Sequence, residues 1–218
     1  MAKVLVGIYG ASGFGREVLP LVRAQLKVVD AELVLVDDGD VGPSMNGCKV
    51  LSYDQFLADD ALEKQVVLAI ANSVIREKLA LRCAADSIPV LTVVADNAVV
   101  LDEVSVGEGA ILCHFTQLTS NIRIGKYFHA NIYSYVAHDC VIGDYVTFAP
   151  AVRCNGNVVI EDHAYIGTGA VIKQGSPNKP LVIGKSAVVG MGAVVTKDVP
   201  PGVTVVGNPA KVFEPRKT

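Results

Sequence analysis

A six-residue repeat fills the second half of this sequence and constrains its fold more than any other feature. Gly107, Gly125 and Gly143 lie 18 residues apart, and each of them follows an aliphatic residue. The series continues at Ile160, where Glu161 stands in place of the glycine. Positions at intermediate steps of six are also small or apolar, namely Leu112, Leu118, Ala130, Val136, Phe148, Cys154 and Ile172. Three hexapeptides in each 18-residue turn predict a parallel β-helix.

Each hexapeptide of such a fold makes a short strand and a tight turn, so that three of them close a triangular coil. We expect the aliphatic residue to point inward and a small residue two to four positions later to let the corner bend. Successive coils stack about 4.7–4.9 Å apart, and several must stack because one coil cannot bury its own inward face. The register breaks at residues 174–180, whose turn-forming residues predict a protruding loop, either a plain surface insertion or one wall of a cleft.

The first 90 residues instead alternate between strand-like and helix-like segments. Short apolar runs predict strands at residues 3–9, 32–36, 64–70 and 89–94. Residues 14–29 carry apolar positions at helical spacing, and Pro20 should lie in the first turn of that helix, which places its start near Arg16. A second helix is predicted around Val74, Ile75, Leu79 and Leu81. We expect a parallel α/β domain over residues 1–95 and a β-helix with a C-terminal tail over residues 96–218.

Composition limits the class of protein. The chain is 51% hydrophobic and 19% charged, with a formal net charge of −3, which excludes a disordered chain and argues against nucleic-acid or anionic-membrane binding. No apolar run is long enough to span a membrane, and the N-terminus lacks a signal sequence, so we expect no membrane insertion and a cytoplasmic location. The five cysteines are scattered through the sequence, so we expect buried thiols. The four histidines lack the close spacing of metal ligands, so we expect no metal site.

Five short segments make the sequence recognisable: GASGFG near the N-terminus, then LVDD, AIANSVIREKL, HDCVIGD and VVGNPAKVF. Together they resemble the bacterial nucleotide-sugar acetyltransferases of the hexapeptide-repeat family, most of all the UDP-4-amino-sugar N-acetyltransferases of the bacillosamine pathway. The sialic acid O-acetyltransferases are more distant relatives. The resemblance implies a Rossmann-like N-terminal domain followed by a left-handed parallel β-helix. It also implies a homotrimer that binds acetyl-CoA between adjacent β-helices and serves glycan biosynthesis.

The candidate catalytic residues lie in and just before the HDCVIGD segment. An amine must lose a proton when it attacks a thioester, and a neutral imidazole suits that role. The resemblance places the catalytic base at His138, with Asp139 orienting the ring, although the family commonly has the longer Glu at that position. Asn131 matches a residue that positions the amine or a water. Cys140 could be imagined as a thiol nucleophile, but the family uses direct attack, and the aliphatic surroundings of Cys140 indicate packing.

Five further residues match the family's binding region for acetyl-CoA. Gly156 lies 18 residues after His138 and matches a glycine near the thioester, where a backbone N–H could stabilise the oxyanion. The position of Thr147 holds a second histidine near the acetyl group in close relatives. Thr168 and Gly169 match the segment that runs along the pantetheine, and Lys211 lies where the family binds the nucleotide end of the coenzyme.

The candidate nucleotide-binding residues lie in the first domain. The motif Gly10-x-x-Gly13-x-Gly15 follows a strand and opens a helix, which can direct backbone N–H groups toward a phosphate, although a tight turn without a ligand would have the same pattern. A carboxylate at the end of the second strand could accept hydrogen bonds from a ribose hydroxyl or a base N–H. The predicted substrate-binding residues are therefore Gly10, Ser12, Gly13, Phe14, Asp37, Asp38, Ala71 and Asn72. Phe14 stands where close relatives frequently have a histidine.

We therefore expect an acetyl-CoA-dependent N-acetyltransferase acting on the 4-amino group of a nucleotide-linked amino-deoxysugar. The resemblance favours UDP, while GDP and dTDP sugars remain open. The expected partners are this nucleotide sugar, acetyl-CoA and further copies of the chain, without a metal cofactor. The main alternative is a sugar O-acetyltransferase of the sialic acid type. Less favoured functions are an oxidoreductase built on the glycine loop, a β-helix metalloenzyme, and a non-catalytic binding protein.

Overall fold

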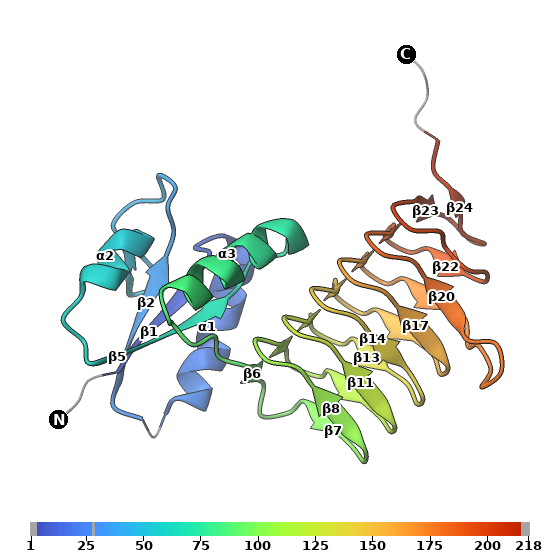
Figure 1. Ribbon diagram of the computed structural model, residues 1–218, viewed down its shortest axis with the longest axis horizontal. Helices are drawn as coiled ribbons and strands as arrows, with labels where there is room; N and C mark the ends of the chain where they lie inside the picture. The colour runs from blue at the N-terminus through green and yellow to red at the C-terminus, as the bar shows by residue number, and fades with distance from the viewer. Residues whose placement is uncertain (1–3, 28, 215–218) are drawn as a thin grey trace. The chain divides into compact units, whose positions relative to one another are not determined.

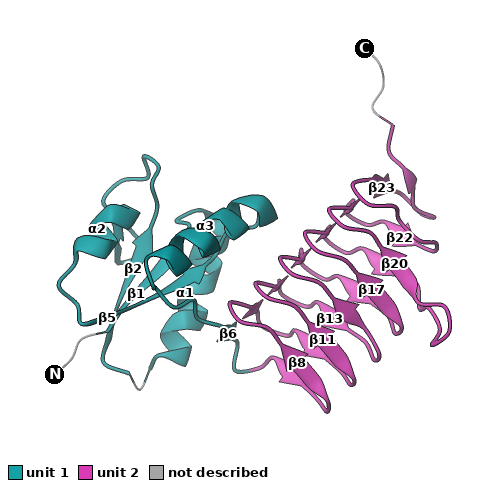
Figure 2. Cartoon of the chain, viewed as in Figure 1, with its two compact units in different colours: residues 1–96 teal, residues 97–218 magenta. Residues whose placement is uncertain are grey.

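The computed structural model describes residues 4–27 and 29–214 and divides the chain into two compact units, residues 1–96 and 97–218 (Figures 1 and 2). The first unit mixes helices and strands, and the second is built almost entirely of short strands. The elements of the first unit are β1 (Val4–Tyr9), α1 (Gly13–Gln25), β2 (Ala31–Val36), β3 (Ser44–Met45), β4 (Cys48–Leu51), α2 (Tyr53–Ala58), β5 (Glu63–Leu68), α3 (Ser73–Ala85) and β6 (Val93–Val94).

A five-stranded sheet in the order β3-β4-β2-β1-β5 forms the centre of the first unit. Strand β1 pairs in parallel with both β2 and β5, and β4 continues the sheet in parallel beyond β2. The apolar run of β1 explains its central place, because Leu5, Val6 and Ile8 are fully buried, as parallel strands with two covered faces require. Helix α1 packs against β1, and α3 packs against β5. The expected parallel α/β architecture is confirmed.

The predicted start of the first helix is wrong. Helix α1 begins at Gly13, directly after Ser12, so that Pro20 lies in the helix interior and not in its first turn. Proline there removes one main-chain hydrogen bond and crowds the carbonyl of Arg16. Pro20 and Arg16 both face solvent, where water can satisfy that carbonyl. Of the residues predicted for this region, Lys3 and Val28 lie outside the described ranges, and Val29 lies beyond the helix.

Helix α3 exposes much of the apolar pattern that predicted it. Val74 and Leu81 are 65% and 64% exposed, whereas the buried positions of this helix include Arg76, Ala80 and Cys83. The periodicity therefore found the helix but assigned the wrong face to the core. Arg76 is fully buried because its guanidinium donates hydrogen bonds to the carbonyls of Ile70 and Ala71, at 2.6 and 3.2 Å, before the helix begins.

The second unit is a parallel β-helix with three sheet faces. One face contains β7 (Val99–Val100), β10 (Gln117–Leu118), β13 (Tyr135–Val136), β16 (Arg153–Cys154), β19 (Val171–Ile172) and β22 (Val194–Val195). The next contains β8 (Val104–Val106), β11 (Ile122–Ile124), β14 (Val141–Ile142), β17 (Val158–Ile160) and β20 (Leu181–Ile183). The third includes β9 (Ile111–Leu112), β12 (His129–Ala130), β15 (Thr147–Phe148), β18 (Tyr165–Ile166), β21 (Val188–Val189), β23 (Thr204–Val206) and β24 (Lys211–Val212).

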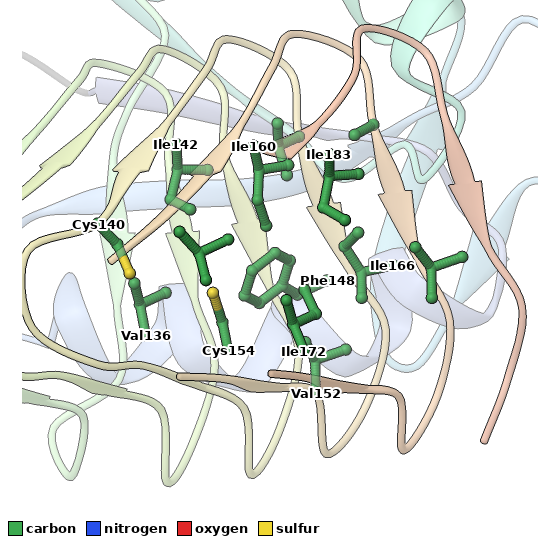
Figure 3. Packing of buried hydrophobic residues seen from close by; sticks show 14 of the residues in the cluster. Val136, Cys140, Ile142, Phe148, Val152, Cys154, Ile160, Ile166, Ile172 and Ile183 are labelled. Carbon is green, nitrogen blue, oxygen red and sulfur yellow. The ribbon is translucent and has the colours of Figure 1, made fainter. Parts of the chain in front are cut away.

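The aliphatic residues of the repeat fill the interior of the β-helix, as expected. Ile142 pairs with Ile160, and Ile160 with Ile183, so that each side chain stacks on its equivalent in the next coil (Figure 3). Cys140 and Cys154 lie among these residues, and all five cysteines of the chain are buried. The stacked column gives every coil the same inward surface, which explains why the 18-residue period persists in the sequence.

The corners of the coils differ from the expected small residues. In one coil the left-handed conformation is adopted by Tyr133, Asp139 and Tyr145, with φ of 60°, 59° and 58°. Large side chains at these corners stack on one another between coils, as Tyr127, Tyr145 and His163 do at centroid distances of 4.9 and 5.1 Å. Ring stacking between neighbouring coils can offset the cost of the left-handed backbone.

The expected loop at residues 174–180 interrupts the coil between β19 and β20. Ser176 and Lys179 form an antiparallel bridge within it. Gly175 donates a hydrogen bond to the carbonyl of Gly156, and Leu181 donates one to Asn157, so that both ends of the loop keep the coil register. Among the described residues, no helix combines the length and the apolar composition that a membrane crossing would need.

Candidate active site

His138 and Asp139 form the turn that connects β13 to β14, at a corner of the triangular coil that we name the His138 corner. The equivalent residues of the neighbouring coils are Ser120 and Asn121 on one side and Gly156 and Asn157 on the other. Main-chain hydrogen bonds fix this stack, since Asp139 N–H donates to the Ser120 carbonyl at 3.1 Å. The N–H of Asn157 donates to the His138 carbonyl at 3.0 Å.

The imidazole and the carboxylate of this corner contact each other directly. His138 Nδ1 lies 2.7 Å from Asp139 Oδ2, so that the shorter aspartate reaches the ring. Asn121 Nδ2 donates to the other carboxylate oxygen, Oδ1, at 3.2 Å. Hydrogen bonds from His138 and then from Asn121 hold the pKa of Asp139 below its usual value. An ionised carboxylate at Nδ1 favours the tautomer in which Nδ1 carries the proton and Nε2 can accept one.

Both side chains remain accessible, at 49% exposure for His138 and 47% for Asp139. Cys140, by contrast, is 1% exposed, and its thiol is directed to the carbonyls of Asn155 and His138, at 3.3 and 3.6 Å. The thiol of Cys140 is thus part of the core. The corner therefore presents one polar group suited to proton transfer, the exposed imidazole of His138.

The structure places the catalytic candidate Asn131 and three of the acetyl-CoA candidates at two different corners. Gly156 stacks beside His138, and among the described residues no hydrogen bond uses its N–H. Asn131, Thr168 and Gly169 lie instead at the corner that contains Tyr133. That second column is continuous, because Gly169 N–H donates to the Pro150 carbonyl and Gly192 N–H to that of Thr168. Within one chain, Asn131, Thr168 and Gly169 therefore do not meet the imidazole.

Thr147 and Lys211 also lie away from the His138 corner. Thr147 is in β15, on the third face, where it pairs with His129 and Tyr165 and is 6% exposed. Lys211 begins β24, which pairs with β23 at the end of the same face. Neither side chain reaches His138 within a single β-helix.

A groove beside the inserted loop was predicted only as one of two possibilities. It has a volume of about 660 Å³, and its lining includes the lysines Lys173, Lys179 and Lys197. Its one acidic lining residue, Asp198, already accepts a hydrogen bond from Val182 N–H at 3.0 Å. In the stack of coils at this corner, Gly156 lies beside His138, and the inserted loop lies beside Gly156. The basic groove is therefore two coils beyond His138, at the same corner.

The glycines of the first-unit motif have separate reasons for being glycine. A Cβ on Gly15 would lie 1.7 Å from the Gly10 carbonyl oxygen, and Gly10 itself has φ of +112°. Packing therefore requires Gly10 and Gly15. A Cβ on Gly13 would meet nothing within 4 Å, so packing does not explain that residue. Ser12 precedes α1 without a side-chain capping bond, whereas Asn72 caps α3 by accepting from Val74 and Ile75.

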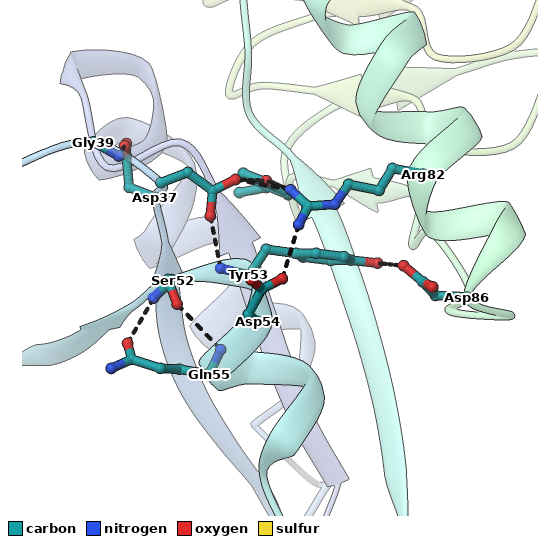
Figure 4. A network of polar contacts seen from close by, with 10 residues as sticks. Asp37, Gly39, Ser52, Tyr53, Asp54, Gln55, Arg82 and Asp86 are labelled. Atoms are coloured by element: carbon teal, nitrogen blue, oxygen red, sulfur yellow. Dashed lines mark hydrogen bonds and ion pairs between the residues drawn. The ribbon is translucent and has the colours of Figure 1, made fainter.

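The two adjacent aspartates after β2 have different surroundings, and Figure 4 shows Asp37, Tyr53 and Arg82 in this network of polar contacts. Asp37 accepts one backbone N–H on each oxygen, from Gly39 and from Ala11, both at 2.9 Å. Asp38 accepts from Tyr53 N–H on one oxygen and from the Tyr9 hydroxyl and Arg82 on the other. Burial opposes ionisation of Asp38, but the hydrogen bonds from Tyr9, Tyr53 and Arg82 outweigh it and lower its pKa.

Arg82 lies in α3 and connects the network around Asp38 to α2. Its role was not predicted from the sequence. It donates to Asp38 and Asp54 at 2.9 and 3.0 Å, and its guanidinium lies 4.2 Å from the centre of the Tyr53 ring. The Tyr53 hydroxyl donates to Asp86 at 3.0 Å. Asp38 thus holds α2 and α3 to the sheet through three hydrogen bonds, whereas Asp37 accepts only two, so that Asp37 has more acceptor capacity left for a ligand.

The described ranges contain no group of three or more histidine, cysteine, aspartate or glutamate side chains arranged to hold a metal ion. The residue that prediction missed at the His138 corner is Asn121. The signal for it was present, because Asn121 precedes Asp139 by one 18-residue period and must stack beside it.

Comparison with known proteins agrees with this architecture. Residues 6–83 match the family of PglD N-terminal domains. The GDP-perosamine N-acetyltransferase of Escherichia coli O157:H7 is 53% identical over 183 residues, which are 83% of this chain and 83% of that protein.

Two solved structures extend the similarity over both units. WeeI from Acinetobacter baumannii AYE is 64% identical, with a TM-score of 0.95 over 96% of this chain and all of that one (100%). The acetyltransferase domain of PglB from Neisseria gonorrhoeae FA1090, solved in complex with acetyl coenzyme A, is 27% identical. Its TM-score is 0.85, over 96% of this chain and 98% of that one.

Proposed function

Because this chain belongs to the family of acetyl-CoA-dependent N-acetyltransferases that act on nucleotide-linked aminosugars, we propose that His138 is the general base of its reaction. The observation that carries this proposal is the 2.7 Å contact between His138 Nδ1 and Asp139 at an exposed corner. With Nδ1 held by an ionised carboxylate, Nε2 is the ring atom that can take a proton from the sugar amine.

The reaction then balances without a covalent enzyme intermediate. The amine nitrogen attacks the thioester carbonyl carbon while its proton passes to His138 Nε2. The resulting oxyanion can accept a hydrogen bond from a backbone N–H, and that of Gly156 has no acceptor among the described residues. Collapse expels the coenzyme A thiolate, which recovers the proton from the imidazolium. Asp139 stabilises that imidazolium for as long as it exists.

A second copy of the chain would complete the site. Asn131, Thr168 and Gly169 share a corner that does not meet His138 within one β-helix, yet the family resemblance assigns all of them to the same reaction. A homotrimer would bring these residues together if the His138 corner of one copy faced the corner that holds Asn131, Thr168 and Gly169 in the next copy. The sugar amine and the acetyl group of acetyl-CoA would then react where the copies meet.

Mixed oligomers test this arrangement. Copies carrying His138→Ala and copies carrying Asn131→Ala are each expected to be nearly inactive alone. After co-expression and random assembly, about one quarter of the sites should combine an intact His138 with an intact Asn131 from another copy. Recovery of activity in the mixture supports the shared site, while a mixture as inactive as its parents would contradict it.

The phosphates of acetyl-CoA would bind in the basic groove of Lys173, Lys179 and Lys197. Ammonium groups attract phosphate oxygens as point charges, and the groove lies along the same corner as His138. Replacing Lys173 and Lys179 by alanine should raise KM for acetyl-CoA but leave KM for S-acetylpantetheine, which lacks the nucleotide, unchanged. Equal effects on both donors would place the phosphates elsewhere, for example near Lys211.

The nucleotide would bind in the first unit, at the start of α1 and beside Asp37. Gly13, whose position packing does not explain, leaves room for a phosphate near the first N–H groups of the helix. Ala71 and Asn72 would flank the base. The sequence resemblance favours UDP, whereas the Escherichia coli relative is named for a GDP sugar.

A substrate panel resolves the nucleotide and the acceptor atom together. UDP-, GDP- and dTDP-linked 4-amino-4,6-dideoxysugars would be compared with their 4-hydroxy counterparts by release of free coenzyme A thiol. We expect turnover of one amino sugar and none of the hydroxy sugars. Thiol release with the hydroxy sugars alone would contradict N-acetylation by this site.

A further inference from the structure

His138 lies between two neighbouring coils of the β-helix, and each coil contributes one residue to its surroundings. Asn121, Asp139 and Asn157 repeat the same left-handed conformation, with φ of 56°, 59° and 56°. Hydrogen bonds between the main chains of successive coils fix their register at this corner. The position of the imidazole is therefore determined by three successive coils.

Asn121 holds the carboxylate that orients the ring. Its amide donates to Asp139 Oδ1 at 3.2 Å, while the other oxygen, Oδ2, faces His138 Nδ1 at 2.7 Å. A carboxylate with one oxygen anchored in this way cannot rotate about its last torsion without losing a hydrogen bond. Asn121 thereby restricts the plane in which Asp139 can meet the imidazole.

Gly156 provides the space into which the ring fits. A Cβ on Gly156 would lie 2.5 Å from Cε1, 2.6 Å from Nε2 and 3.0 Å from Nδ1 of His138, and these imidazole atoms are its three nearest neighbours. For Gly107 and Gly167, the atoms nearest a Cβ belong to the backbone of the next coil, at 2.6 Å. Coil stacking thus explains those two glycines, whereas the imidazole explains Gly156.

We propose that Gly156 and Asn121 are positioning residues that fix the His138 imidazole for proton transfer, Gly156 through the space it leaves and Asn121 through its contact with Asp139. This inference rests on the proposed role of His138 as the general base. It assigns Gly156 a function in addition to any that its backbone N–H has toward the oxyanion. A methyl group at position 156 would push aside a half-exposed side chain, so that the ring moves and the coil stays intact.

A double-mutant cycle between Gly156 and His138 tests the first part. Gly156→Ala keeps the backbone N–H, and we expect kcat to fall about 100-fold because small misplacement of a catalytic group has effects of that size. KM for both substrates and the melting temperature should stay close to wild type. In the His138→Ala background the same change should alter the residual rate less than about twofold, since a residue acting through His138 has nothing left to position.

Gly190→Ala is the matched control for the substitution. Its Cβ would meet a side-chain atom, Val206 Cγ1, at a similar distance of 2.7 Å, away from the His138 corner. We expect this variant to retain wild-type kcat. If Gly156→Ala retains wild-type kcat, or loses as much rate without His138 as with it, the positioning role of Gly156 is wrong.

Asn121→Gly tests the second part, because glycine accepts the φ of 56° and removes the side chain that holds Asp139. We expect kcat to fall about 10-fold, at the lower end of the range for residues that orient a catalytic group. The loss should vanish in the Asp139→Asn background, and an undiminished loss there would refute action through Asp139. If His138→Ala itself keeps full activity, the proposal that His138 is the general base is wrong. In that case the double-mutant cycle between Gly156 and His138 would show no coupling.

Discussion

Two carboxylates in this molecule, one in each unit, are held by similar numbers of hydrogen bonds but serve different purposes. Asp38 accepts from Tyr9, Tyr53 and Arg82, groups that come from three different elements of the first unit. Asp139 accepts from Asn121 and contacts His138, both at one corner of the β-helix. All the partners of Asp38 belong to the fold, whereas the imidazole beside Asp139 keeps a second nitrogen, Nε2, for a substrate.

Residue types alone therefore do not reveal what a pair of adjacent polar residues does. Asp37-Asp38 and His138-Asp139 both look like functional pairs. In the first, Asp38 fastens α2 and α3 to the sheet, and Asp37 accepts fewer hydrogen bonds and retains more acceptor capacity. In the second, the carboxylate prepares a neighbouring side chain for chemistry. Substitutions at the two sites should therefore separate stability from catalysis.

Asp139→Asn should give the largest effect on kcat among substitutions at the two carboxylate sites. We expect kcat to fall about 10- to 100-fold, because an amide can donate to Nδ1 and place the ring proton on Nε2, the wrong tautomer for a base. Asparagine tolerates the left-handed backbone of position 139, so the melting temperature should not change. Steady-state kinetics beside a thermal unfolding curve measures both. A kcat equal to wild type would remove Asp139 from the mechanism.

Arg82→Leu should show the opposite pattern. Loss of the contacts with Asp38 and Asp54 is expected to destabilise the first unit by about 1 kcal/mol, a modest figure because these side chains are partly exposed. The melting temperature should fall by a few degrees while kcat at saturating substrate is retained. Calorimetry with parallel activity assays distinguishes the outcomes. A large loss of kcat without loss of stability would reverse the assignment of this network.

Asp38→Asn tests whether the ionised carboxylate of Asp38 stabilises the first unit, because that contribution depends on pH. The folded-state pKa of Asp38 lies below the ordinary value of 3.8, so its ionised form stabilises the fold above about pH 3.8. That stabilisation is lost as pH falls through the lower folded-state value. The melting temperatures of wild type and variant should therefore differ at pH 6 and converge toward pH 2. A gap that stays constant over this range would show that ionisation of Asp38 does not contribute.

Cys140→Ala should have the smallest effect on catalysis, although Cys140 lies two residues from His138. Its thiol is buried and directed to main-chain carbonyls, so we expect kcat to stay within about twofold of wild type. Stability should fall modestly, because a buried sulfur atom is removed from the core. Loss of most of the activity, with stability retained, would favour a thiol nucleophile.

The repeat made the β-helix predictable because every coil buries the same aliphatic column. The family, the enzyme class and the coenzyme followed from five short segments, and these predictions are confirmed. Asn121 was missed because its role depends on stacking with a residue 18 positions away. The resemblance placed Asp139 as the residue that orients His138, but the direct contact of the shorter aspartate with Nδ1 depends on the left-handed backbone at position 139.

The first unit was predicted less completely because its signals are weaker or contradictory. Hairpin β3–β4 and helix α2 were missed because they are short, although Ser52 and Gln55 form a capping box that marks the start of α2. The start of α1 was misplaced because Pro20 was assumed to lie in a first turn. The role of Asp38 depends on Tyr9, Tyr53 and Arg82, which are distant in sequence and meet only in the folded unit.

The single-turnover rate of His138→Ala tests whether His138 accepts the proton. Enzyme in excess over acetyl-CoA, with full binding of the coenzyme confirmed by calorimetry, would be mixed with excess nucleotide aminosugar in a rapid-quench instrument. We predict normal binding of both substrates and an acetyl-transfer rate about 1,000-fold below wild type, within the range for loss of a general base. Acetyl transfer at the wild-type rate would contradict the account, because another group would then accept the proton.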